Sequence, residues 1–72
     1  MLQYKLDVMQ KLSEKGLSSY ALRKQQILGE STMTKLRRKQ AISWENIDTI
    51  CRLLRCQPGD LLEWIDDEVS RD

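Results

Sequence analysis

The chain has 72 residues, of which 40% are apolar and 32% charged, with three Gly, one Pro, no His and a formal net charge of +1. This length suits one small domain with a thin core, and so few turn residues argue against an all-β fold. No apolar run is long enough for a membrane span or a secretory signal, and the chain lacks both a phosphate-binding Gly loop and a nucleophile motif. We therefore expect an all-α domain in the cytoplasm that is not an enzyme, with no membrane contact and no evident small-molecule ligand.

The first predicted helix covers residues 4–15. Apolar side chains recur at helical spacing from Leu6 to Leu12, and Gly16 follows as a natural left-handed stop. Residues 1–5 alternate between apolar and polar, a pattern that also allows a short extended segment before the helix.

Two short helices are predicted next, over residues 19–26 and 30–39. Ser18 can cap the first of them, and the leucines on either side of this cap can form a hydrophobic staple. In the second helix, Met33 and Leu36 face inward. Both helices are shorter than the about 12–15 residues that can persist alone in water, so packing on neighbouring helices must hold them.

The fourth predicted helix covers residues 44–55 and has the clearest signals. Ser43 can cap it, with Ile42 and Ile47 as a hydrophobic staple. An apolar stripe at helical spacing from Ile47 to Leu54 marks the face that packs against the rest of the domain.

A fifth helix is predicted over residues 58–65. Pro58 is tolerated at a first helical position, and Asp60 lies near the positive end of the helix dipole. The five helices are expected to form a compact bundle in a single domain over residues 1–66, followed by an acidic tail over residues 67–72 that frays.

The tryptophans and cysteines have both structural and functional interpretations. Packing in the core is favoured for Trp44, whereas for Trp64 packing and an exposed dimer surface are equal alternatives. Cys51 is interpreted as a small core residue, and Cys56 lies near a helix end. The cysteines do not match a C-x-x-C pair, and the chain has no His to complete a zinc site, so we expect no metal and no cofactor.

Charge is distributed unevenly along the chain. Residues 1–40 hold nine Lys and Arg against three Asp and Glu, whereas residues 41–72 hold three against eight. This asymmetry suggests a basic working face and an acidic, solubilising one. The basic run KLRRK lies at residues 35–39, in the third predicted helix, and by itself it is equally typical of a solvated helix face.

Residues 19–38 match the size of a helix-turn-helix, in which the second helix fits the major groove of DNA. Lys35 could donate to guanine, and Glu30 could accept from the amino group of cytosine. The side chains suited to reading base edges are Glu30, Ser31, Thr34, Lys35 and Arg38. The expected phosphate contacts are Ser19, Arg23, Lys24, Thr32, Arg37 and Lys39.

Three stretches of the chain carry a family resemblance: residues 18–22 (SSYAL), 31–38 (STMTKLRR) and 50–63 (ICRLLRCQPGDLLE), of which the last is the most distinctive. With these stretches the chain resembles the lambda-repressor/Cro-like (Xre) helix-turn-helix family from about Lys5 to Ile65. The resemblance implies a five-helix bundle that binds double-stranded operator DNA as a homodimer and represses or activates transcription. We therefore expect a sequence-specific regulator, with repression favoured.

The turn departs from the family's pattern. Where the family commonly has Gly followed by a β-branched residue, this chain has Gln26 and Ile27, and the segment up to Gly29 is one residue longer. The first base-reading side chain is therefore either Glu30 or Ser31.

A second hypothesis, from a different class, is that the scaffold serves protein interaction, for example as an antitoxin-like partner with weak or no DNA binding. The low net charge and the acidic second half of the chain motivate it. The acidic residues 66–68 could also recruit a partner, although a solubilising role is favoured for them.

Overall fold

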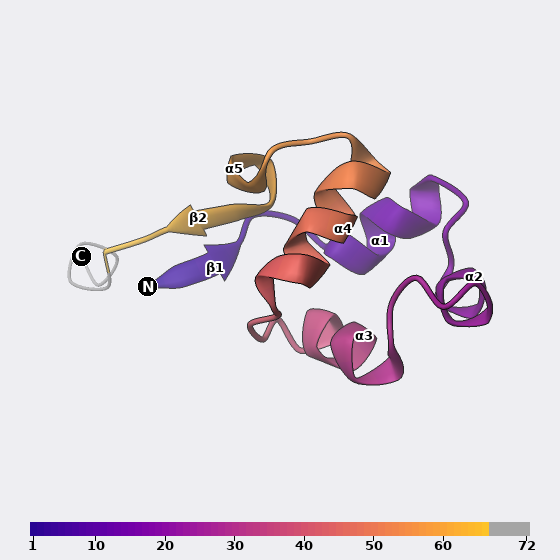
Figure 1. Cartoon of the computed structure of the whole chain (residues 1–72). Coiled ribbons are helices and arrows are strands. Elements are labelled where there is room, and N and C mark those ends of the chain that lie inside the picture. The colour runs from indigo at the N-terminus through magenta and orange to yellow at the C-terminus, as the bar shows by residue number, and fades with distance from the viewer. Residues whose placement is uncertain (67–72) are drawn as a thin grey trace.

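The computed structural model describes residues 1–66, and Figure 1 shows how their helices and strands are arranged. In chain order these are β1 (Leu2–Tyr4), α1 (Val8–Glu14), α2 (Ser19–Lys24), α3 (Glu30–Arg37), α4 (Trp44–Leu54), α5 (Pro58–Leu61) and β2 (Leu62–Trp64). The predicted five-helix fold is confirmed, and a two-stranded sheet is added to it. The sheet lies on the opposite side of the helices from α2. The predicted acidic tail, residues 67–72, falls outside the described residues.

The helix predicted over residues 4–15 begins only at Val8. Asp7 is the N-cap in an extended conformation, and its carboxylate accepts a hydrogen bond from the backbone N–H of Gln10 at 3.1 Å. Tyr4 belongs to β1, so the short extended segment that the alternating pattern allowed is present. The helix stops near Gly16, whose φ of 83° is the left-handed conformation expected for this residue.

The helix predicted over residues 58–65 ends at Leu61, because the following three residues form β2. The two strands pair antiparallel, with Leu2 opposite Trp64 and Tyr4 opposite Leu62. The pairing joins the two ends of the described chain. Residues 62–64 form hydrogen bonds with residues 2–4 instead of continuing the helix. A local pattern of apolar residues does not indicate pairing with a segment so far away in the sequence.

The other three helices begin at the predicted residues and end one or two residues early. A residue with positive φ follows each of them, and a left-handed residue cannot continue a right-handed helix. None of these residues is a glycine, which explains why the sequence pattern placed the ends too late. The left-handed residues are Gln26 at 57°, Lys39 at 59° and Arg55 at 53°.

Serine caps set the starts of α2 and α4, as predicted. The hydroxyl of Ser18 accepts from the N–H of Ala21, and that of Ser43 accepts from the N–H of Asn46, both at 3.2 Å. Each bond satisfies a backbone donor that the first turn of a helix leaves without an intrahelical partner.

Replacing Ser43 by alanine is expected to lower the free energy of unfolding by about 1 kcal/mol, because the N–H of Asn46 loses its acceptor. For a domain of this size, such a loss lowers the melting temperature by about 4–8 °C, which thermal denaturation followed by circular dichroism can measure. Ser43→Gly is the matched control and should cost only a few tenths of a kcal/mol. An unchanged melting temperature for the alanine variant would show that the cap does not stabilise α4.

The core contains eight buried apolar residues, which come from all five helices and from the turn between α2 and α3. Four of them are 0–1% exposed: Leu12 of α1, Leu22 of α2, Met33 of α3 and Ile50 of α4. The others are Val8, Leu28, Leu36 and Leu61. No polar or charged residue is buried among residues 1–66, so hydrophobic burial rather than internal ion pairing holds the bundle together.

Trp44 corrects a prediction, because its side chain is 90% exposed rather than packed in the core. It is the first residue of α4. Ile42, just before the helix, packs against the core instead. Trp64 is also exposed, at 69%, so of its two alternatives the structure favours an exposed surface over packing in the core.

Cys51 and Cys56 are in contact at the end of α4. The N–H of Cys56 donates to the carbonyl oxygen of Cys51 at 3.0 Å across the left-handed Arg55. This is the arrangement of a Schellman C-cap, in which an apolar contact between these two positions is usual. Burial raises the pKa of the Cys56 thiol, and the adjacent Cys51 raises it further. Both cysteines therefore have a structural explanation, and Cys51 packs partly buried against the core as predicted.

Tyr4 connects β1 to the segment that follows α3. Its hydroxyl donates to the carbonyl oxygen of Gln40 at 2.7 Å, and burial raises the pKa of the phenol. The folded state thus holds this proton more tightly than the unfolded chain does. The stability that the buried phenol contributes is therefore present below the ordinary pKa of 10.0 and is lost at more alkaline pH.

Candidate nucleic-acid interface

Helices α2 and α3 are joined by a turn over residues 25–29 that packs into the core. Leu28 is 2% exposed, and the N–H of Ile27 donates to the carbonyl oxygen of Leu22 at 2.9 Å. Gln26 adopts the left-handed conformation that the family's Gly would adopt more easily. The longer turn is therefore held by one buried leucine, which the sequence analysis did not assign to the core.

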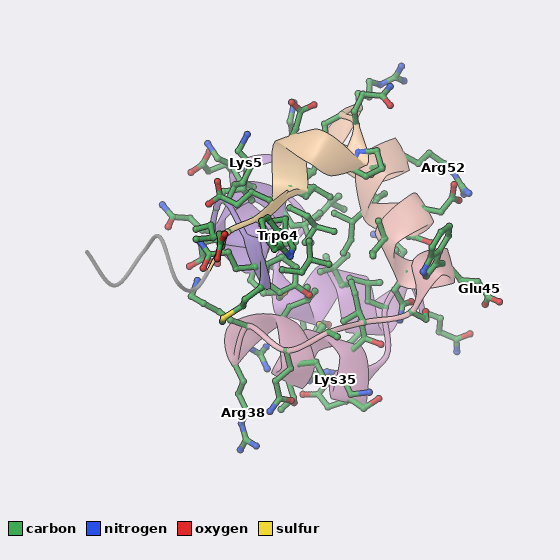
Figure 2. The ribbon with its side chains drawn as sticks, turned by 90° about the vertical axis from the view of Figure 1, so that its left-hand side faces the viewer. Lys5, Lys35, Arg38, Glu45, Arg52 and Trp64 are labelled. Carbon is green, nitrogen blue, oxygen red and sulfur yellow. The ribbon has the colours of Figure 1, made fainter. Side chains whose placement is uncertain are left out.

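Helix α3 begins at Glu30, with Gly29 as its N-cap. Met33 and Leu36 are buried at 0% and 5% exposure, as predicted, and they fix the rotation of the helix about its axis. Its solvent side carries Ser31, Lys35 and Arg38, all exposed, with Thr34 half-buried beside them. Figure 2 shows Lys35 and Arg38 extending from the same edge of the molecule, away from Glu45 and Arg52 on the α4 side.

Glu30 and Arg23 contact each other. The Nε of Arg23 donates to Oε2 of Glu30 at 2.9 Å, and both side chains are 58% exposed. The sequence predicted separate roles for them, a base contact for Glu30 and a phosphate contact for Arg23. The structure instead brings them together across the turn.

Thr32 and Lys24 also have partners within the domain. The Thr32 hydroxyl accepts from the side-chain amide of Asn46 at 3.0 Å, which joins α3 to α4. The Nζ of Lys24 lies 5.6 Å from the centre of the Tyr20 ring, a cation–π distance. Both residues were predicted to contact phosphates, and these contacts limit how freely their side chains can turn toward DNA.

A shallow hollow of about 410 Å³ lies between the start of α2 and the end of α3. Two of the predicted phosphate-binding cations, Arg37 and Lys39, line it together with Ser19 and its neighbour Ser18. Gln10 and Ser13 of α1 also line the hollow and were missed by the sequence analysis. They are exposed polar residues of an ordinary amphipathic helix, so no sequence signal distinguishes them.

The comparison with protein-family models identifies the domain. The model for the Cro/C1-type HTH DNA-binding domain matches residues 5–67, which is most of the chain. The chain belongs to the Cro/C1-type family. Searches of curated proteins and of solved structures found no match.

Membership in this family accounts for the arrangement around α3. This Cro/C1-type domain is a DNA-binding module of a family that is not catalytic. The structure has two short helices joined by a turn, α2 and α3, where the sequence predicted the helix-turn-helix. Among residues 1–66, no helix is long and apolar enough to cross a membrane. The family resemblance recognised from the sequence is confirmed.

Proposed function

We propose that this Cro/C1-type domain is a sequence-specific transcription regulator, acting as a repressor that places α3 in the major groove of operator DNA. The observation that carries the proposal is the solvent side of α3, where Lys35, Arg38 and Ser31 are exposed opposite a buried apolar face. Hydrogen-bonding side chains on one face of a short, rigidly held helix are what direct readout of base edges requires. Repression follows when a bound domain blocks access of RNA polymerase.

The proposed base contacts are Glu30, Ser31, Thr34, Lys35 and Arg38. The proposed phosphate contacts are Ser19, Lys24, Thr32, Arg37 and Lys39. Arg23, which the sequence also predicted to contact a phosphate, is instead paired with Glu30. The hollow supports the second group, because Arg37, Lys39 and Ser19 converge on it and a phosphate could lie there.

The regulator is proposed to bind a pseudo-palindromic operator as a homodimer. The exposed apolar side chains Leu2, Trp44 and Trp64, at 64%, 90% and 69%, support an association of this kind. They lie on the first and last strands and at the start of α4, outside the helix-turn-helix.

A second candidate function is protein interaction without strong DNA binding. A groove of about 740 Å³ favours it, because Trp44, Ile47, Leu2 and Leu62 line this groove together with the two cysteines. An adjacent gene for a toxin-like protein would favour this alternative, whereas an inverted repeat in a neighbouring promoter would favour the regulator.

Selection of bound sequences from a random DNA pool, at one fixed salt concentration, tests the proposed function. The wild-type domain is expected to enrich one motif, and the triple variant Lys35→Ala, Arg37→Ala, Lys39→Ala is expected to enrich none. The control, Arg52→Ala with Arg55→Ala, removes cations from the α4 side and should enrich the wild-type motif. Equal selectivity of the triple variant, or no motif for the wild type, would refute the proposal.

A further inference from the structure

The ion pair between Arg23 and Glu30 differs in its placement from two other ion pairs of the domain. Lys11 with Glu14 and Arg52 with Asp48 each lie within a single helix. The Arg23–Glu30 pair instead joins α2 to the first residue of α3. It therefore holds the start of the proposed reading helix to the helix before it.

Stability does not account for this pair. Both side chains are 58% exposed, and exposed ion pairs contribute little to the free energy of unfolding, because solvent screens them and ordering two long side chains costs entropy. The N–H groups of α3 also have no side-chain cap, since Gly29 is the N-cap. A carboxylate in the first turn, already favoured by the helix dipole, needs no arginine to remain there.

The Arg23–Glu30 pair leaves hydrogen-bonding groups on both side chains that can contact a base pair. The contact uses Nε of Arg23 and Oε2 of Glu30, so Oε1 remains as an acceptor and the terminal guanidinium nitrogens remain as donors. In the major groove a C·G pair presents the cytosine amino group as a donor beside the guanine O6 and N7 acceptors. An acceptor and a donor held side by side match that edge.

The guanidinium of Arg23 also reduces the repulsion between Glu30 and the DNA phosphates. A lone carboxylate approaching DNA is repelled by the phosphates, whereas one that is paired with arginine carries no net charge into the groove. Arg23 can thus both orient Glu30 and neutralise it.

On the basis of the proposed function, we propose that Arg23 and Glu30 act as one unit that selects a C·G pair at the edge of the operator half-site. Glu30 accepts from the cytosine amino group. Arg23 is a positioning residue for Glu30, rather than the independent phosphate contact that the sequence predicted, and its terminal nitrogens face the guanine of the same pair.

The test is to determine base preference at each operator position for the wild type, Arg23→Ala, Glu30→Ala and the double variant. Both single variants should lose about tenfold of the preference for C at the same single position, and the double variant should lose no more than either alone. Glu30→Gln should change that preference from C to A, because an amide pairs with adenine N6 and N7. Arg52→Ala is the matched control, because it removes an arginine from an exposed ion pair on α4, and it should leave every base preference intact.

Three results would contradict the Arg23–Glu30 unit. If Arg23→Ala weakens all sequences alike and lowers the salt dependence by about one phosphate contact while the C preference survives, Arg23 binds a phosphate and the unit does not exist. A wild-type motif without any position sensitive to Glu30 overturns the inference while the proposed function stands. Absence of any wild-type motif overturns both, so the two failures are distinguishable. Circular dichroism should show all variants folded, because both residues are exposed.

Discussion

Replacing Leu22 by alanine is expected to destabilise the domain by about 2–5 kcal/mol, a large fraction of the stability of a domain this small. Leu22 is 0% exposed and is the only buried residue of α2. Alanine removes its apolar contacts and leaves a cavity that the surrounding helices can fill only in part. The six-residue helix α2 cannot persist without this anchor, because its length is far below that of an isolated stable helix.

Urea denaturation followed by circular dichroism measures this effect. Leu2→Ala is the matched control, since the same chemical change at a side chain that is 64% exposed should alter the free energy of unfolding by less than about 0.5 kcal/mol. Similar losses for the two variants would contradict the view that α2 is held through Leu22.

Replacing Lys35 by alanine is expected to weaken binding to the selected operator by about 1–3 kcal/mol and to relax base preference at one position. Lys35 is exposed on the solvent side of α3, with Met33 and Leu36 of the same helix turned into the core. Its ammonium can therefore reach a base edge when α3 enters the groove. A scrambled duplex, which offers no matching base, should lose much less affinity.

Arg37→Ala is the contrasting variant, because Arg37 lines the hollow beside α2. It should weaken the operator and the scrambled duplex alike and reduce the dependence of log K on log salt by about 1. Fluorescence anisotropy titrations of both duplexes over a range of salt concentrations measure these quantities. If Lys35→Ala and Arg37→Ala behaved identically, the division of α3 into base-reading and phosphate-binding residues would be wrong.

Local signals were sufficient to predict the helical fold. Ser18 and Ser43 mark helix starts through hydrogen bonds to residues only three positions away, and Gly16 marks an end through its own backbone conformation. The inward position of Met33 and Leu36 follows from their spacing within one helix. Each of these features is decided by residues within about one helical turn, which is why they can be read from the chain.

The candidate site was predicted in outline by the same reasoning. The exposed face with Ser31, Lys35 and Arg38 is simply the complement of the buried one. The pairing of Arg23 with Glu30 was not foreseen, because it depends on how the left-handed Gln26 directs the chain from α2 to α3. A left-handed glutamine has no reliable sequence signal.

The local sequence was enough to predict five helices, the serine caps of α2 and α4, the inward face of α3 and the family to which the domain belongs. The pairing of β1 with β2, the burial of Leu28 in the turn and the exposure of Trp44 emerge only from the folded chain. The physical reason is the range of the interactions involved. Helical hydrogen bonds and caps join near neighbours, whereas strand pairing and core packing join residues that come together only when the whole chain has folded.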